Sequence, residues 1–292
     1  MRLSIVIVSY NTKDKLRMTL RSVFDSNFDF EFEVFAVDNH SSDGSAAMVR
    51  AEFPRVLLIE NSKNSGYAKA NNQAIRKARG KYVLLLNSDV AVSPSAFDTM
   101  VKFMDNNPEA GIAGCKVLRE DGRLDSACRR SFPTPWVAFS RFSGLQSVFP
   151  KSRFFARYNL TFLPENELSE VDSVMGAFLL IRRDVIGKIG LLDEDYFMYG
   201  EDIDWCYRAK QAGYKVFYVP TAAAVHYKGS SSKRSSKKAL FEFHNSMRIF
   251  YDKHYKDRYS RFTRFVVMAA IWKMYFLRAF RNFFKAEKLV SK

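Results

Sequence analysis

The sequence predicts an α/β protein with a mostly parallel sheet flanked by helices and an amphipathic helical extension at the C-terminal end. Three observations predict this fold class. Short apolar runs alternate with helical stretches in the first part of the chain, polar residues gather where those runs end, and the C-terminal part combines helical periodicity with an excess of basic residues. Strands that alternate with helices at this spacing pair in parallel, because each helix crosses back over the sheet.

The expected strands are short apolar runs rich in β-branched residues. The first is Leu3–Val8, which leads into a helix from about Lys13 to Phe24. The most informative is Tyr82–Leu86, because a continuous apolar run is typical of a strand buried on both faces. The other expected strands are Glu33–Val37, Val56–Glu60, Val171–Arg182 and Tyr214–Val219.

Helices are expected between these strands. Tyr67–Arg79 ends at Gly80, and Glu201–Gln211 follows a loop rich in acidic and aromatic residues. The pattern loosens over Val117–Asn166, where glycines and prolines interrupt aromatic and basic residues. This excursion from the regular pattern predicts an irregular loop on the substrate side.

The positive charge is concentrated in the C-terminal part. The chain has a net charge of +15, and Lys228–Lys292 contains 17 Lys and Arg against 4 Asp and Glu. The polar stretch Ser230–Lys238 predicts a mobile linker, so we expect one domain over residues 1–229 and a basic, aromatic helical tail over residues 230–292.

The tail predicts a helix that lies on a membrane. Its apolar residues recur at three- and four-residue steps, and no run is long enough to span a bilayer. The residues of this stripe are Phe262, Phe265, Val266, Ala269, Trp272, Phe276, Phe280 and Phe283. Cations beside the stripe favour an anionic membrane surface. Packing of the stripe on the main domain or on a second subunit, as in a homodimer, stays open, whereas motifs that read nucleic-acid bases are missing.

The cysteines favour a reducing, cytosolic setting. Cys115, Cys128 and Cys206 are odd in number and lack the spacing of metal ligands or of a disulfide framework. Met1 and Arg2 lead straight into the first apolar run, so we expect no signal peptide.

Acidic residues stand at the ends of expected strands and at the start of one helix. Asp38 and Asp89 follow strands, and Glu201 and Asp202 begin a helix. Ligands collect at the carboxyl edge of such sheets, where separate acids can contact a ribose, hold a metal or remove a proton. Ordinary turn and helix-capping roles remain the alternative.

Two further segments carry candidate binding residues. His226 follows the last expected strand and could join Asp89 around a divalent metal, although packed histidines are common. Asn64 and Gly66 belong to a polar loop that leads into a helix carrying Asn71, and this loop could support a phosphate or ribose or could be a capped turn. The chain has no phosphate-binding G-x-x-x-x-G-K-[ST] loop and no G-x-G-x-x-G dinucleotide fingerprint.

Read in order, six motifs resemble the family 2 glycosyltransferases of GT-A fold, particularly the bacterial rhamnosyltransferase-like branch. The motifs are SIVIVSYNT (Ser4–Thr12), VDNHSSDGS (Val37–Ser45), NSGYAKANN (Asn64–Asn72), LLNSD (Leu85–Asp89), GAFLLIRR (Gly176–Arg183) and LDEDYFMYGEDIDWCYR (Leu192–Arg208). The resemblance covers about residues 2–230, and the order of the motifs makes it specific.

The resemblance implies a role for each matching residue. Asp38 matches the acid that reads the pyrimidine base, Asp89 the last acid of the family's D-x-D metal motif, and Asp202, beside Glu201, the general base. His226 resembles a histidine that some members add to the metal shell. The other implied donor-binding residues are Ser9, Tyr10, Asn11, Asn64, Gly66, Asn71, Asn87 and Ser88, and the implied acceptor or sugar contacts are Gly176, Ala177 and Asp204. Asn87 stands where the family often has Asp, which leaves fewer carboxylates for the metal.

The resemblance therefore implies an inverting glycosyltransferase that uses Mg²⁺ or Mn²⁺ and a nucleotide sugar, with dTDP-L-rhamnose as the expected donor. The expected acceptor is lipid-linked or a polysaccharide, and the expected location is the inner face of the bacterial cytoplasmic membrane, where surface polysaccharides are built. A UDP-sugar donor stays open, as does a non-catalytic nucleotide-sugar or membrane-binding module. A nucleotidyltransferase is disfavoured because no Gly-rich basic signature follows the first strand.

Overall fold

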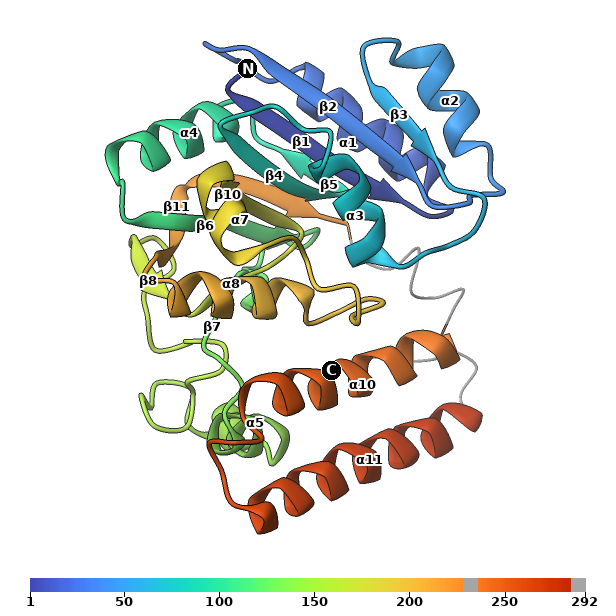
Figure 1. The fold of residues 1–292 in the computed structure, drawn as a ribbon. Coiled ribbons are helices and arrows are strands. Elements are labelled where there is room, and N and C mark those ends of the chain that lie inside the picture. Colours follow the sequence, from blue (N-terminus) through green and yellow to red (C-terminus); the bar gives the residue numbers. More distant parts are fainter. Residues whose placement is uncertain (228–235, 285–292) are drawn as a thin grey trace.

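The computed structural model describes residues 1–227 and 236–284, and it has helices on both faces of a central sheet (Figure 1). The strands are β1 (Leu3–Ser9), β2 (Phe32–Asp38), β3 (Leu57–Glu60), β4 (Tyr82–Asn87), β5 (Val90–Val92), β6 (Ala110–Arg119), β7 (Arg129–Arg130), β8 (Ser169–Val171), β9 (Ser173–Val174), β10 (Phe178–Arg182) and β11 (Lys215–His226). The helices are α1 (Lys13–Phe24), α2 (Ser45–Glu52), α3 (Tyr67–Ile75), α4 (Ala96–Asn106), α5 (Pro135–Phe142), α6 (Leu145–Val148), α7 (Arg183–Ile189), α8 (Glu201–Gln211), α10 (Ser236–His254) and α11 (Arg261–Phe283). The predicted α/β fold class is confirmed.

The main sheet has the strand order β3-β2-β1-β4-β10-β6-β11-β5, with β8 beside β11. Strands β3, β2, β1 and β4 are parallel to one another, whereas β10 is antiparallel to β4 and β6. The side chains of Tyr82–Leu86 in β4 are fully buried, as expected for a strand covered on both faces. Because β1, β2 and β4 are parallel, their carboxyl ends meet, so that Ser9 pairs with Asp38 and Val8 with Asn87.

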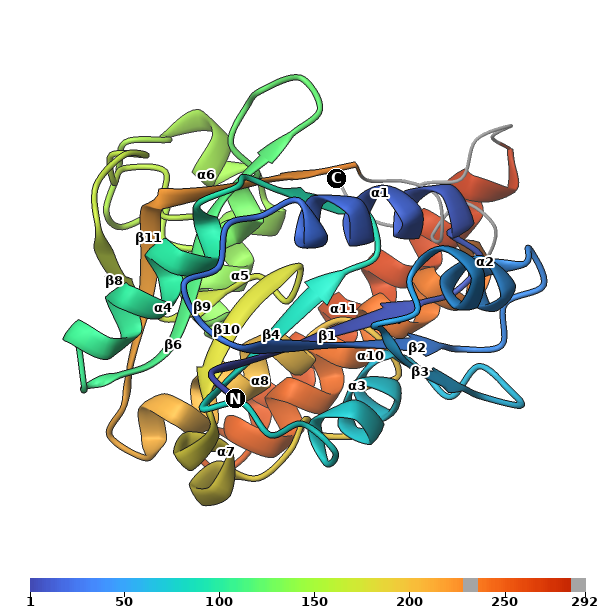
Figure 2. The ribbon, with the colours of Figure 1, turned by 90° about the horizontal axis from the view of Figure 1, so that it is seen from above.

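Two layers of helices cover the sheet. Helices α1, α2 and α4 lie on one side of the strands, and α3, α7 and α8 lie on the other (Figure 2). Apolar side chains from both layers and from the sheet form one continuous core. Helix α8 has eight buried residues, because the sheet covers one of its sides and α10 covers another.

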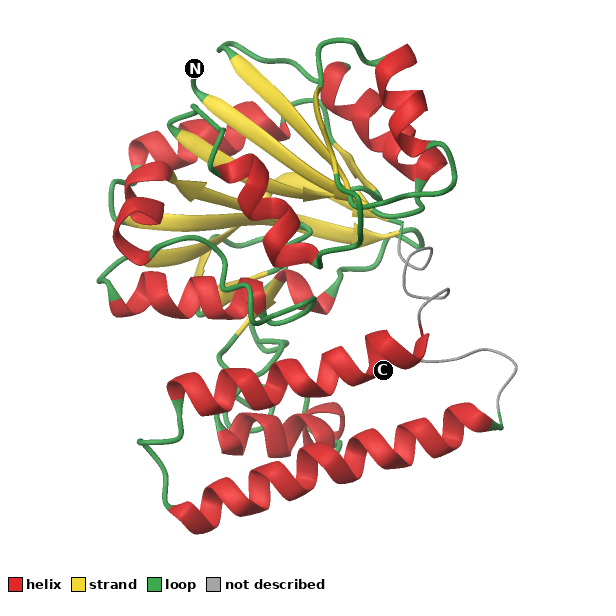
Figure 3. Ribbon diagram, turned by 45° about the vertical axis from the view of Figure 1, so that its right-hand side comes forward, coloured by secondary structure: helices red, strands yellow, loops and turns green. Residues whose placement is uncertain are grey.

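The tail folds into two antiparallel helices, α10 and α11, which lie beyond α8 (Figure 3). The expected helical character is confirmed, but the tail forms two helices, because the helical conformation is interrupted between His254 and Arg261. Ser260 caps the second helix by accepting a hydrogen bond from the Thr263 N–H. Helix α10 packs on the main body through a second buried cluster. That cluster consists of Tyr196, Ile203, Tyr207, Ile249, Phe250, Tyr251 and Tyr255.

The expected boundary near residue 229 and most of the expected linker Ser230–Lys238 lie outside the described residues. The division into residues 1–229 and 230–292 therefore stays a prediction, although α10 packs directly on the main body.

Helix α11 turns much of its aromatic stripe toward solvent. Its inner face contacts α10, and Ile271 is buried there. On the outer face Phe262 is 75% exposed, Phe280 65% and Phe283 80%, so these rings do not pack on the main body. Within the parts of the chain that the structure describes, no helix is long and apolar enough to cross a bilayer.

Three strand expectations need correction. The sequence pattern does not predict β6. The expected single strand Val171–Arg182 is three short strands, because the chain turns at Gly176 and the Phe178 N–H bonds to the Met175 carbonyl. The expected strand Tyr214–Val219 is the first half of β11, which shifts its register on β6 and continues to His226.

Candidate functional site

A line of buried hydroxyl groups runs along the carboxyl ends of β1 and β4. Ser9 Oγ and Thr12 Oγ1 share a hydrogen bond of 2.9 Å, and Thr12 Oγ1 and Ser88 Oγ share one of 3.0 Å. Thr12 thus connects two of the expected donor-binding residues. Tyr10, which lies between Ser9 and Asn11, is half-buried.

Asp38 lies at the end of β2 and is 5% exposed. Its Oδ2 accepts a hydrogen bond of 3.0 Å from the Ser41 N–H, while within the described residues its buried Oδ1 accepts none. The left-handed Asn11 (φ 54°) joins the first loop to the second, because its Oδ1 accepts from the Ser42 N–H at 2.8 Å. The two loops therefore form one rigid wall beside a carboxylate oxygen that can still accept a hydrogen bond.

Asn39 ties a third loop to this wall. Its Nδ2 donates to Asn64 Oδ1 at 3.0 Å, and its Oδ1 accepts from the Ser65 N–H at 3.0 Å. Gly66 follows with φ 89°, and a Cβ added there would lie 2.7 Å from the Phe197 carbonyl oxygen. The close approach of these two loops therefore requires glycine.

Tyr67 joins the donor-side residues to the turn before β10. Its hydroxyl contacts Asn87 Oδ1 and the Gly176 carbonyl oxygen, each at 3.1 Å. The Asn87 N–H bonds to the Ala177 carbonyl at 3.1 Å. Asn71 is fully buried on α3, where its Nδ2 donates to the Tyr67 carbonyl at 2.9 Å.

Asp89 and His226 come together because β11 pairs antiparallel with β5, placing His226 opposite Val90. Asp89 Oδ1 lies 3.0 Å from His226 Nε2, and both side chains are mostly buried. The two atoms are at hydrogen-bond distance from each other, and a carboxylate oxygen beside an imidazole nitrogen is a pair that could hold one divalent cation. Asp125 approaches from the excursion, with Oδ2 3.9 Å from His226 Nδ1. Among the described residues no cluster of three or more acidic, His or Cys side chains forms a complete metal site.

The adjacent carboxylates at the start of α8 have different surroundings. Asp202 Oδ2 accepts hydrogen bonds from Arg130 Nη2 at 2.7 Å and from the Gly176 N–H at 2.9 Å. Glu201 is buried, and within the described residues its Oε2 accepts no hydrogen bond. Burial, and then the nearby charge of Asp202, raise the pKa of Glu201 to about 8.

Asp204 points toward the tail. Its Oδ2 accepts from Arg208 Nε at 2.8 Å, and its Oδ1 lies 2.7 Å from Nε2 of His254 on α10. The carboxylate is 1% exposed. This geometry connects two helices and gives no support to the acceptor contact expected for Asp204.

The structure thus gathers the expected residues into three neighbouring groups and leaves Asp204 outside them. The donor-side group contains Ser9, Tyr10, Asn11, Asp38, Asn64, Gly66, Asn71, Asn87 and Ser88. Asp89 and His226 form the second group, and Glu201, Asp202, Gly176 and Ala177 form the third. The sequence analysis does not identify Thr12, Asn39, Asp125 or Arg130, although Thr12 and Asn39 lie within two of the six motifs.

The fold is the GT-A fold of solved glycosyltransferase structures. S. aureus TarS 1–349 has a TM-score of 0.58 at 17% identity, covering 93% of this chain and 71% of that chain. The mannosyltransferase PcManGT from Pyrobaculum calidifontis, in complex with GDP-Man and Mn²⁺, has a TM-score of 0.57 at 18% identity, covering 85% of this chain and 64% of that chain. At these identities the likeness concerns the fold alone.

The chain belongs to glycosyl transferase family 2, whose family model matches residues 4–190. One relative is the Mycobacterium tuberculosis N-acetylglucosaminyl-diphospho-decaprenol L-rhamnosyltransferase, 29% identical over 264 residues, or 86% of this chain and 85% of that protein. Another is the rhamnosyltransferase WbbL of Escherichia coli, 27% identical over 82% of this chain and 88% of that protein. The family expected from the six motifs is confirmed.

Proposed function

We propose that this family 2 glycosyltransferase transfers L-rhamnose from dTDP-L-rhamnose, with inversion, to a lipid-linked acceptor during bacterial cell-surface polysaccharide synthesis. Two relatives named as rhamnosyltransferases, each aligned over more than four fifths of both chains, support the sugar. The name of the Mycobacterium tuberculosis relative supports a lipid-linked acceptor. A polysaccharide acceptor is the alternative.

The observation that carries the nucleotide assignment is the buried Oδ1 of Asp38, which has no partner among the described residues. Leaving such an oxygen unsatisfied costs about 1–3 kcal/mol, so a ligand that donates a hydrogen bond to it gains affinity. Thymine and uracil both present a ring N–H of this kind. This favours dTDP or UDP as the nucleotide, with Ser9, Tyr10 and Asn11 lining the pocket beside it.

Asp89 and His226 would hold a divalent cation, Mg²⁺ or Mn²⁺, which would neutralise charge on the departing diphosphate. Carboxylate oxygen suits Mg²⁺ and Mn²⁺, and neutral imidazole nitrogen is a common ligand of transition-metal ions; the two atoms lie 3.0 Å apart. Asn87 carries no charge, so the protein supplies only one carboxylate from the LLNSD motif.

Asp202 is the proposed general base. It would accept the proton of the acceptor hydroxyl while that oxygen bonds to the anomeric carbon of the sugar and the bond from this carbon to the diphosphate oxygen breaks on the opposite face. The nucleoside diphosphate leaves with the electron pair of the broken bond, so the configuration inverts and no covalent intermediate forms. The turn at Gly176 and Ala177 adjoins this carboxylate and would line the acceptor side.

A thermal-shift panel tests the donor. The purified chain is incubated with dTDP-L-rhamnose and with UDP-, GDP- and CMP-sugars, with and without Mn²⁺; a ligand at 100 times its Kd stabilises the fold by about 2.7 kcal/mol. We expect a metal-dependent shift with dTDP-L-rhamnose. A shift with UDP-sugars alone would mean that the donor is a UDP-sugar and not dTDP-L-rhamnose. No shift with any sugar nucleotide would favour a non-catalytic module.

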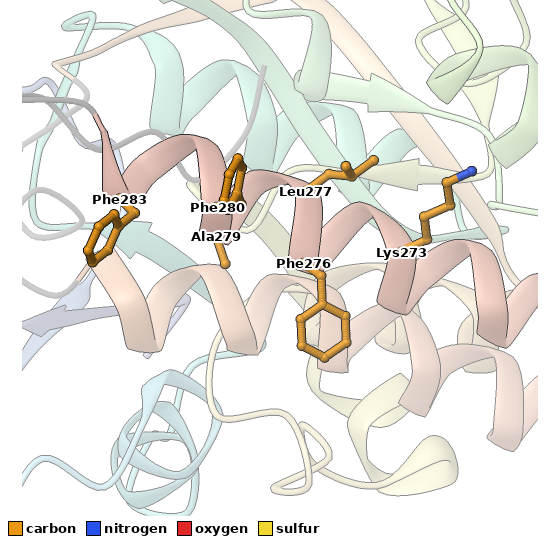
Figure 4. Close-up of a pocket in the computed structure, with 6 residues that line it drawn as sticks. All are labelled: Lys273, Phe276, Leu277, Ala279, Phe280 and Phe283. Carbon is orange, nitrogen blue, oxygen red and sulfur yellow. The ribbon is translucent and has the colours of Figure 1, made fainter.

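The exposed face of α11 supports a second part of the proposal, peripheral binding to the inner face of the cytoplasmic membrane. A shallow apolar depression of about 710 Å³ on this helix is lined by Lys273, Phe276, Leu277, Ala279, Phe280 and Phe283 (Figure 4). Arg261, Lys273 and Arg281 lie on the same exposed helix and suit anionic headgroups. Such a surface would bring the site to a lipid-linked acceptor, although a second copy of the chain could also cover it.

Vesicle flotation distinguishes binding of this face to a membrane from binding to a second copy of the chain. Phe276→Glu with Phe280→Glu should abolish binding to phosphatidylglycerol vesicles, and phosphatidylcholine vesicles should bind wild type weakly. Leu57→Glu, at an exposed apolar residue on β3, is the matched control and should bind like wild type. Loss of a dimer in the double variant, without any change in vesicle binding, would instead identify the face as a subunit interface.

A further inference from the structure

Arg130 is a buried cation that reaches the proposed base from the excursion, 72 residues away in sequence. Its Nη2 donates to Asp202 Oδ2 at 2.7 Å and to the Val174 carbonyl at 2.8 Å. The side chains of Arg130 and Asp202 are each only 10% exposed. A buried arginine beside a carboxylate is costly to desolvate, so this pairing calls for a reason beyond stability.

The hydrogen bonds of Asp202 leave one oxygen able to react. Oδ2 accepts from Arg130 and from the Gly176 N–H, which occupies both of its lone pairs. Oδ1 accepts only from the adjacent Ile203 N–H at 2.8 Å among the bonds formed by the described residues. A lone pair on Oδ1 therefore remains for the proton of an incoming hydroxyl.

Glu201 is the competing carboxyl group, because two adjacent buried carboxylates resist ionising together. Burial, and then the charge of Asp202, raise the pKa of Glu201 above its usual value, which favours the protonated form of Glu201. Arg130 contacts Asp202 and not Glu201 in the bonds that the structure describes. The guanidinium is therefore hydrogen-bonded to one carboxylate of the adjacent pair, that of Asp202.

We infer that Arg130 is a positioning residue that selects Asp202, rather than Glu201, as the ionised carboxylate and aims its free oxygen at the acceptor. This inference rests on the proposed role of Asp202 as general base. Arg130 acts through Asp202 and takes no proton itself.

Several other ionisable groups interact electrostatically with Arg130, Asp202 or Glu201. They are Tyr67 of α3, Tyr158 of the excursion, and Asp204 and Cys206 of α8. Burial raises the pKa of Cys206 to about 12, and burial likewise raises the pKa of Tyr67 above its usual value. Cys206 and Tyr67 therefore stay neutral over the pH range in which the rate is measured. Among the groups named here, Arg130 is the cation that contacts Asp202.

The adjacent Arg129 provides a matched control. It is equally buried on β7, but it donates to the Pro164 and Leu163 carbonyls and lies over the Tyr218 ring. Arg129→Met therefore removes a buried arginine from the same strand without removing a contact to Asp202. Arg130→Lys keeps a charge while losing the geometry of the guanidinium.

The test measures nucleoside diphosphate release by the full chain from dTDP-L-rhamnose, or from the nucleotide sugar that the thermal-shift panel selects, with an N-acetylglucosaminyl-diphospho-polyprenol acceptor. For Arg130→Met we expect kcat/KM near neutral pH to fall about 100-fold and the acid limb of the rate profile to move up by about 1–3 pH units. Affinity for dTDP should stay within about twofold, as the pair lies outside the donor-side group. Arg130→Lys should restore the position of the acid limb and part of the rate.

An unshifted acid limb in Arg130→Met, or an equal shift in Arg129→Met, would overturn the inference. If Arg130→Met does not fold, Arg130→Gln, which can still donate to Val174, takes its place with the same expected shift. Asp202→Asn distinguishes failure of the base role proposed for Asp202 from failure of the positioning role inferred for Arg130. An inactive Asp202→Asn beside a normal Arg130 variant rejects only the role of Arg130, whereas an active Asp202→Asn rejects the base assignment and the inference together.

Discussion

His254 Nε2 lies 2.7 Å from Asp204 Oδ1, although the two residues are 50 positions apart. The contact joins α10 to α8, the helix that begins with Glu201 and Asp202. The tail is thus bonded directly to the element that carries the proposed base.

His254→Ala should therefore destabilise the whole fold. The substitution leaves one oxygen of the buried Asp204 without its partner, and losing a hydrogen bond to a charged group costs about 1.5–3 kcal/mol. The free energy of unfolding in urea measures this loss, and His254→Asn, which keeps a donor, should recover part of it. Lys256→Ala, at an exposed residue two positions further along, is the control. Equal stabilities for His254→Ala and wild type would mean that the contact contributes nothing.

Asp202→Asn should lose transfer and keep donor binding. The amide cannot take the acceptor proton, and general-base catalysis contributes about 100- to 10,000-fold to rate. Turnover with the lipid acceptor and the Kd for dTDP, measured separately, distinguish the two effects. Asp204→Asn, two residues further along α8, should weaken stability more than turnover. Wild-type turnover by Asp202→Asn would remove Asp202 from the role of base.

His226→Ala should weaken the binding of Mn²⁺ in the presence of dTDP. Removal of one of the two proposed ligands would leave the Asp89 carboxylate alone, and we expect affinity to fall at least about 10-fold, the lower end of the loss seen for outer-shell partners of metal ligands. Electron paramagnetic resonance of free Mn²⁺ measures this without any turnover. His244→Ala, at a buried histidine on α10, serves as the control. Unchanged Mn²⁺ affinity would show that His226 is a packed residue.

Asp105→Asn should change stability in a pH-dependent way. Burial opposes ionisation of Asp105, but hydrogen bonds from Lys81, Tyr82 and Arg2 outweigh it and lower its pKa to about 2. The pKa of the unfolded carboxyl is about 3.9, so its stabilising contribution is complete above about pH 4 and is lost as the pH falls through about 2.

Urea unfolding at several pH values measures this difference. The variant should be less stable than wild type by about 1–2 kcal/mol near neutral pH, and the gap should close toward pH 2. Asp29→Asn, at a largely exposed carboxylate that is 3.5 Å from Lys102, should leave no such gap. A difference in unfolding free energy between Asp105→Asn and wild type that is constant with pH would show that ionisation of Asp105 does not contribute to stability.

Elements with strong local patterns could be predicted from the sequence. Tyr82–Leu86 is an unbroken apolar run and forms the core of β4, and the expected helix Glu201–Gln211 has the bounds of α8. Strand β6 escaped prediction because its first half contains small residues in place of β-branched ones. Gly114 is among them because a Cβ there would lie 2.7 Å from the Val174 side chain. Close packing between strands thus requires small residues at these positions, and small residues lack the β-branched side chains by which a strand is recognised in a sequence.

The candidate site could be predicted where its residues lie in motifs at strand ends. Asp38 and Asp89 are of this kind. Arg130 could not be found, since its partner Asp202 is 72 residues away and only the pairing of β7 with β9 brings the two together. The contact of Asp204 with His254 could not be predicted for a similar reason, because the sequence does not reveal that α10 covers that side of α8.

Strand β11 enters the sheet between β6 and β5, late in the chain. Synthesis therefore delivers the nucleotide pocket of β1, β2 and β4 well before Asp202 and His226 leave the ribosome, and chains fold from the N-terminal end as they emerge. We expect a nascent chain that ends near residue 190 to retain nucleotide at most, without the capacity to transfer sugar. The helices made last, α10 and α11, lie beyond α8 (Figure 3), and we expect a chain that ends before α8 to lack sugar transfer even where it still binds nucleotide.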